Sequence, residues 1–139
     1  MRRFRTLKRK AKKAKKIDYL RLKAQRFYSA CRTRTNLSVE PSYHIWQWLL
    51  KIDPFVCYYS GVPLKKDDFS IDHKQPLKRG GTHDFSNLCV CTKGMNTAKG
   101  ALTEKEFKDL LALISKWEDR GVNLLARLKI SGTMFNRRK

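Results

Sequence analysis

Five polar residues between positions 72 and 96 are of the types that can bind a metal ion and activate a water molecule. Asp72 and His73 are adjacent at the end of a short apolar run, His83 follows in a glycine-containing loop, and Asn87 and Asn96 lie further along the chain. Carboxylate and amide oxygens are ligands for hard cations such as Mg²⁺. An imidazole has an unperturbed pKa near neutrality and can act as a general base. These groups suffice to hold one divalent metal on a phosphodiester and to activate a water beside it.

The order and spacing of these residues resemble the HNH endonucleases, a family with a ββα-metal fold. The match lies between Pro54 and Gly100, about a third of the chain. The segments that carry it are Ile71-Asp72-His73, Pro76-Leu77, Arg79-Gly80-Gly81-Thr82-His83-Asp84, Ser86-Asn87-Leu88 and Asn96-Thr97-Ala98-Lys99-Gly100.

The resemblance implies a role for each polar residue of the motif. His73 is then the general base, and Asp72 and Asn96 are ligands of a catalytic Mg²⁺ or Mn²⁺. Asn87 matches a structural residue whose side chain binds the backbone of the loop and orients His73. For His83 the role stays open between contact with the scissile phosphate, help to the leaving group and simple phosphate binding. Contacts to other phosphates are expected from four basic residues of the motif: Lys74, Lys78, Arg79 and Lys99.

Asp72 and His73 are neighbours on one expected strand, so strict alternation would point their side chains to opposite faces. In the resembled family the pair sits where the strand ends and the backbone bends, so that both groups serve one site. We therefore expect both side chains at a single metal centre.

Many HNH proteins frame this motif with a zinc ribbon of two Cys-x-x-Cys pairs, and most of that frame is missing here. The corresponding segments read Cys57-Tyr58-Tyr59-Ser60 and Thr92-Lys93-Gly94-Met95. Hydroxyl and thioether groups are poor ligands for Zn²⁺. We therefore expect no structural zinc, and a site held in place by packed helices. The alternative is a rearranged zinc site built from the four cysteines: Cys31, Cys57, Cys89 and Cys91.

The charge of the chain points to a polyanionic partner. Among 139 residues there are 32 Lys and Arg against 12 Asp and Glu, a formal net charge of +20. Basic proteins bind nucleic acids because neutralising the phosphates releases condensed counterions, so we expect double-stranded DNA as the partner. The sequence has no apolar run long enough for a membrane span and no apolar segment of a secretory signal. A cytoplasmic location without a membrane partner is therefore expected.

The sequence predicts an α+β protein with a ββα-metal core, flanking helices and a basic N-terminal arm. Residues 1–16 form the arm, with ten Lys or Arg and no acid. Residues 17–53 form a helical region, 54–102 the nuclease motif, and 103–139 further helices and a basic tail.

Apolar spacing predicts the individual elements. One helix has Ile17, Leu20, Ala24, Phe27 and Cys31 on one face, and a second covers 43–52 and ends before Asp53-Pro54. Strands are expected at 55–59, 69–72 and 88–91, followed by a helix that starts near Gly94–Asn96. Thr103 and Glu106 form a capping-box signature that opens a helix with an apolar face. That face comprises Phe107, Leu110, Leu111, Ile114 and Trp117, and after a break at Gly121 a short helix is expected at 122–130.

The leading functional hypothesis is a metal-dependent DNA endonuclease that leaves 5′-phosphate and 3′-hydroxyl ends, similar to free-standing HNH enzymes of phages and mobile elements. It would act as a homing-type enzyme or as a nicking accessory to a phage packaging terminase, alone, as a homodimer or with a phage protein. A second hypothesis is a DNA-binding protein whose HNH fold no longer cuts. A third is a purely architectural basic protein.

Overall fold

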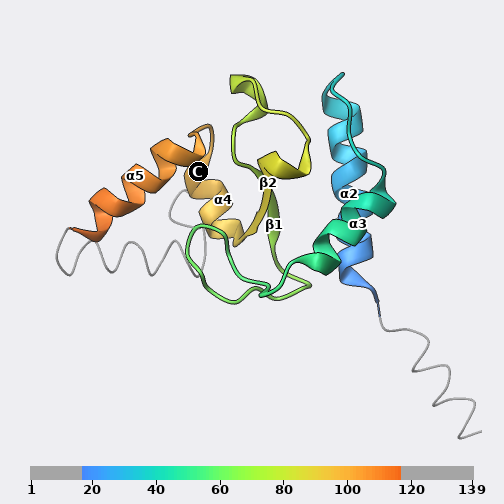
Figure 1. The fold of residues 1–139 in the computed structure, drawn as a ribbon, viewed down its shortest axis with the longest axis horizontal. Coiled ribbons are helices and arrows are strands. Elements are labelled where there is room, and N and C mark those ends of the chain that lie inside the picture. The colour runs from blue at the N-terminus through green and yellow to red at the C-terminus, as the bar shows by residue number, and fades with distance from the viewer. Residues whose placement is uncertain (1–16, 117–139) are drawn as a thin grey trace, which may run out of the picture.

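The computed structural model describes residues 17–116, which form a mixed α+β fold (Figure 1). Within this range there are four α-helices and one two-stranded sheet. The expectations for residues 1–16, Trp117, Gly121, 122–130 and the basic tail lie outside the described residues. None of the helices within 17–116 has the length and apolar character needed to cross a membrane.

The helices α2 (Tyr19–Arg34) and α3 (Ser42–Lys51) lie side by side. The Asp18 side chain caps α2 by accepting from the backbone N–H of Arg21 at 3.1 Å, as expected for an acidic N-cap residue. The predicted apolar face of α2 is confirmed for Leu20, Ala24 and Cys31, which are buried. Ile17 was wrongly included, because it precedes the helix and is 57% exposed.

The sheet is an antiparallel pair of β1 (Ser70–His73) and β2 (Leu88–Cys91), with Asp72 opposite Cys89 and His73 opposite Leu88. The long connection between the strands contains two short 3₁₀ turns, Leu77–Arg79 and Phe85–Asn87. The strand expected at 55–59 does not form: this segment makes only an isolated bridge between Val56 and Pro63. It is nevertheless joined to β2, because the backbone N–H of Tyr58 donates to the Val90 carbonyl at 2.9 Å.

One face of the hairpin packs against α2 and α3. Ile71, Leu88 and Val90 join Leu20, Ala24, Ile45, Leu49 and Phe69 in a single buried cluster. Residues two apart on a strand point to the same face, which explains why Leu88 and Val90 both belong to this cluster.

The other face is covered by α4 (Lys93–Lys99) and α5 (Glu104–Ser115). Cys57, Cys91, Met95 and Phe107 form the second buried cluster there. Thr92 caps α4 by accepting from the backbone N–H of Met95 at 3.1 Å, and the predicted capping box of Thr103 and Glu106 is confirmed. Three residues at positions that match the zinc ribbon of other HNH proteins thus have other roles here. Cys57 and Met95 pack in an apolar cluster, and Thr92 caps α4.

Candidate functional site

The motif residues lie around the end of β1, where the hairpin passes into its long loop. Asp72, His73 and Lys78 line a surface pocket of about 320 Å³, together with Pro76, Leu77, Gly100 and Ala101. The two residues that were predicted as metal ligand and as base, Asp72 and His73, thus border one pocket. Their side chains nevertheless make their contacts on opposite faces of the hairpin.

Asp72 is buried among groups from the α4 side of the sheet. Its Oδ2 accepts from the Tyr59 hydroxyl at 2.7 Å and lies 3.4 Å from Nζ of Lys99. The thiol of Cys89 approaches the same oxygen at 3.9 Å. Burial raises the pKa of Asp72, while the hydrogen bond from Tyr59 and the charge of Lys99 act in the opposite direction. Because these contacts all fall on Oδ2, the second carboxylate oxygen is the one suited to a further ligand.

His73 faces α2 and is held by a chain of hydrogen bonds. Its ring stacks on Phe27, with centroids 5.7 Å apart, and its Nε2 lies 2.9 Å from Nδ1 of His83. Nε2 of His83 in turn lies 2.9 Å from the hydroxyl of Thr35. Burial lowers the pKa of His73 to about 4, with smaller effects from His83 and Lys99 in the same direction. The imidazole is therefore neutral at pH 7.

His83 is 2% exposed and makes both of these ring contacts inside the protein. Burial also lowers its pKa, against an opposing effect of Asp84. An imidazole with both nitrogens so engaged does not reach a phosphate at the surface, so direct phosphate contact by His83 does not fit the structure. His83 instead contacts the ring of His73 inside the protein.

Cys31 brings a third ligand atom to the two histidines. One ligand atom each from Cys31, His73 and His83 lies within 4.8 Å of the others, and the cluster could hold a metal ion. Burial raises the pKa of the Cys31 thiol. The alternative with four cysteines at one site does not form, because Cys31 lies with the histidines while Cys57 and Cys91 pack in the second cluster.

Asn87 ties together the two ends of the long loop. Its Oδ1 accepts from the backbone N–H of Gln75 at 2.8 Å, and its Nδ2 donates to the carbonyls of Gln75 and Thr82 at 3.0 and 2.8 Å. These hydrogen bonds are those expected of a structural asparagine. Gly81 lies so close to this segment that an added Cβ would be 1.9 Å from the Gln75 carbonyl oxygen, so the position requires glycine.

The four basic residues that were expected to contact phosphates differ in their exposure and in the contacts that they already make. Lys78 is exposed at the edge of the pocket, whereas Arg79 forms a two-pronged ion pair with Glu106 at 2.6 and 2.9 Å. Lys74 lies over the ring of Tyr58, 4.6 Å from its centroid. Lys99 is not at the surface, where a phosphate contact was expected: its side chain is 1% exposed, and its amine donates to the His73 carbonyl at 2.9 Å. Pairing with Asp72 compensates the burial of this charge.

Asn96 lies half-buried in the middle of α4. Its backbone carbonyl accepts from Gly100 at 3.2 Å. Within residues 17–116 it is not among those that line the pocket beside Asp72, so the structure does not bring the two predicted metal ligands together there.

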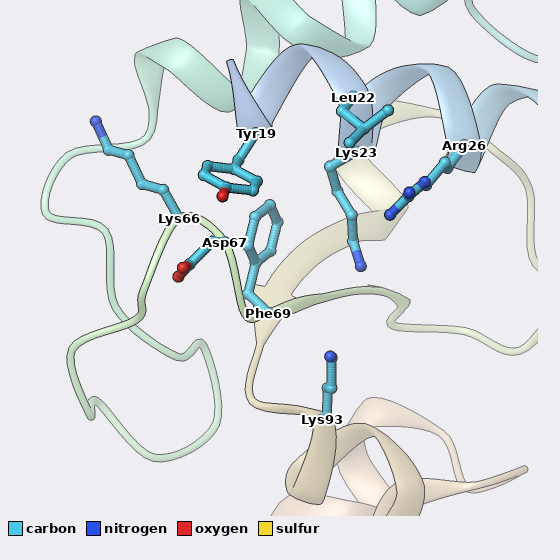
Figure 2. A pocket seen from close by; sticks show the side chains of 8 residues that line it. All are labelled: Tyr19, Leu22, Lys23, Arg26, Lys66, Asp67, Phe69 and Lys93. Carbon is cyan, nitrogen blue, oxygen red and sulfur yellow. The ribbon is translucent and has the colours of Figure 1, made fainter. Parts of the chain in front are cut away.

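A second, basic pocket lies between α2 and the start of α4. Figure 2 shows Lys23 and Arg26 extending from α2 toward the space that Lys93 enters from below. Burial lowers the pKa of Lys23, and the neighbouring charges of Lys93 and Arg26 lower it further. Lys93 is paired with Asp68 at 2.8 Å. This concentration of cations is suited to an anionic group such as a backbone phosphate.

Comparison with known proteins does not assign the chain to a family. No protein-family model matches it, and no curated protein matches it.

Three residues of the site were not singled out by the sequence as functional: Tyr59, Thr35 and Phe27. Phe27 and Cys31 stood on the expected apolar face of α2, which indicated burial but not the histidines that they meet. Tyr59 and Thr35 had no pattern that could have identified them.

Proposed function

We propose that the protein is a metal-dependent DNA endonuclease of the HNH type. The observation that carries the proposal is the pocket at the end of β1, which Asp72, His73 and Lys78 border together. Residues that carry a carboxylate, a neutral imidazole and a cation thus border one opening, and these are the types of group that phosphodiester hydrolysis requires. The order of two antiparallel strands followed by α4 and the loop clamp of Asn87 also agree with the resembled fold.

The hydrogen bonds behind His73 prepare it to accept a proton. The Thr35 hydroxyl donates to the Cys31 carbonyl at 3.2 Å, so Nε2 of His83 must donate to Thr35. Nδ1 of His83 is then an acceptor, and Nε2 of His73 donates to it. The lone pair of neutral His73 therefore resides on Nδ1, the atom that would take the proton from an attacking water.

Asp72 would hold the divalent metal through the oxygen that faces away from Tyr59 and Lys99. A carboxylate oxygen is a hard ligand that suits Mg²⁺ or Mn²⁺. When bound, such an ion polarises the phosphate and neutralises the charge that develops on the leaving oxygen. The charge of Lys99 opposes the rise that burial causes in the pKa of Asp72.

Double-stranded DNA is the proposed substrate because of the charge distribution. The net charge of +20 and the cations Lys23, Arg26 and Lys93 would bind backbone phosphates without reading bases. Lys78 is the exposed basic residue among those that line the proposed catalytic pocket.

The buried pair of Asp72 and Lys99 favours one alternative function. The ammonium of Lys99 already neutralises the carboxylate of Asp72, so this carboxylate does not need a metal ion. A DNA-binding protein that does not cut would have such an arrangement. The two functions differ in whether bound DNA is cut.

Nicking of supercoiled plasmid in Mg²⁺ and in Mn²⁺ tests the proposal, with DNA binding measured in parallel by fluorescence anisotropy. We expect the wild type to nick, and His73→Ala to bind DNA normally without nicking. His44→Ala is the matched control, since His44 is exposed and paired with Glu40. Binding without metal-dependent cleavage by the wild type would support the alternative, and cleavage by His73→Ala would remove the proposed base.

A further inference from the structure

We propose that Cys31, His73 and His83 form a binding site for one zinc ion, separate from the Asp72 carboxylate, and that zinc bound there inhibits cleavage. The binding site stands on its own geometry, whereas the inhibition rests on the proposed role of His73 as the base.

The donor set is that of a thiophilic metal. One thiol and two imidazoles meet from three separate segments, α2, β1 and the long loop. Sulfur and imidazole nitrogen are the ligands of Zn²⁺, whereas Mg²⁺ prefers oxygen. Cys31 and His83 are 6% and 2% exposed, so the site is enclosed.

The spacing is close to what a tetrahedral ion needs. Zn–N bonds of about 2.0 Å and Zn–S bonds of about 2.3 Å imply ligand separations of roughly 3.3 to 3.6 Å. The two nitrogens lie 2.9 Å apart and all three ligand atoms lie within 4.8 Å of one another. The imidazoles must therefore separate by about half an ångström, and the sulfur needs to shift by at most about 1 Å.

Thr35 supplies the outer contact that metal-binding histidines usually have. Its hydroxyl lies 2.9 Å from Nε2 of His83, which leaves Nδ1 directed at His73. Such outer hydrogen bonds fix the ring and its tautomer. Three protein ligands leave the fourth position to water.

Zinc binding changes the protons of two residues. The Cys31 thiol loses its proton to solvent when the sulfur bonds the ion, so one proton is released for each zinc bound. His73 stays neutral, but its one N–H moves from Nε2 to Nδ1 because Nε2 becomes the ligand. Nδ1 then has no lone pair for a water proton, and the base is lost.

Cobalt spectroscopy of the full chain tests the binding site directly. Co²⁺ occupies zinc sites, and a cysteine ligand gives a thiolate-to-cobalt charge-transfer band in the near ultraviolet. We expect this band in the wild type at one equivalent of Co²⁺, its loss on adding one equivalent of Zn²⁺, and no effect of excess Mg²⁺. Cys31→Ala should abolish the band, and His83→Ala should weaken Co²⁺ binding by at least about tenfold.

Cys57→Ala is the matched control, because Cys57 is also buried but lies in the second cluster. It should keep the band, and circular dichroism should verify that each variant is folded. The site is refuted if the wild type lacks the band or if Cys31→Ala retains it. If Cys31→Ala does not fold, His83→Ala serves as the test. An unchanged Co²⁺ affinity of the His83→Ala variant would also refute the proposed zinc site.

Plasmid nicking in excess Mg²⁺ tests the inhibition. The quantity to compare is the nicking rate with equimolar Zn²⁺ divided by the rate without Zn²⁺. This ratio should fall about tenfold or more in the wild type and stay near one in Cys31→Ala. Equal inhibition of both proteins would place the inhibitory zinc elsewhere. A cobalt site in a protein that never nicks DNA would overturn the nuclease proposal and leave the zinc site intact.

Discussion

The ammonium of Lys99 lies 3.4 Å from the carboxylate of Asp72, and both side chains are almost fully buried. The same ammonium donates to the His73 carbonyl at 2.9 Å. Lys99 stands at the end of α4 and Asp72 and His73 at the end of β1, so one buried cation joins the helix to the strand beneath the candidate site.

A double-mutant cycle should show that this pair is strongly coupled. Lys99→Met leaves a buried carboxylate without its partner and should reduce the free energy of unfolding by about 3–5 kcal/mol. Asp72→Asn leaves a buried ammonium and should also destabilise. The double variant should lose much less than the sum of the two, as measured by urea unfolding at pH 7.

The exposed pair of Lys105 and Asp109, with side chains 86% and 66% exposed, provides the control cycle. Its coupling should stay below about 1 kcal/mol. Additive effects of the Lys99 and Asp72 variants would show that the two charges do not interact as the structure indicates.

Replacing Asn87 should loosen the loop that carries His83. Asn87→Ala removes three hydrogen bonds to backbone groups, and the loss should cost about 1–3 kcal/mol of unfolding free energy. Hydrogen exchange at Gln75 should also accelerate, because its backbone N–H loses its acceptor. Asn36→Ala is the control at an exposed asparagine and should change neither quantity.

The helices and two of the strands could be predicted because their causes are local in sequence, whereas the loop role of Asn87 was implied by the family resemblance. The capping box at Thr103, the apolar spacing of α2 and the two strand runs each depend on residues a few positions apart. Residues 55–59 were mistaken for a strand because an apolar run does not reveal whether a partner strand is available.

The contacts of the buried polar groups could not be predicted, because they join residues far apart in the chain. Cys31 has the spacing of a core residue, and only the packing of α2 against the hairpin brings it to His83. Lys99 was expected at the surface because lysine is almost never fully buried unless paired, and its pairing with Asp72 depends on where α4 crosses β1.

The basic pocket should contribute to DNA binding through phosphates. Lys23→Ala combined with Arg26→Ala should weaken binding and reduce the slope of log affinity against log salt by about 2. Fluorescence anisotropy at several salt concentrations measures this slope. Lys105→Ala, on an exposed face of α5 and paired with Asp109, should leave it nearly unchanged. An unaltered slope in the double variant would exclude this pocket from the DNA interface.

The ion pair between Arg79 and Glu106 should make stability depend on pH in the acid range. Arg79 holds the pKa of Glu106 at about 2, well below its ordinary value of 4.5. The folded protein therefore keeps this carboxylate ionised at pH values where the unfolded chain already binds the proton. The stabilisation is fully present above pH 4.5 and is lost as the pH falls toward 2.

Glu106→Gln isolates this effect, because glutamine removes the charge but can still accept the capping-box hydrogen bond from Thr103. The difference in unfolding free energy between wild type and variant should be largest above pH 4.5 and should shrink steadily toward pH 2. Urea unfolding at low ionic strength is the suitable measurement, since salt screens an exposed pair. Arg79→Met should give the same pH profile, because it removes the other half of the pair. A difference that does not change with pH would mean that the charge of Glu106 does not stabilise the contact between α5 and the loop.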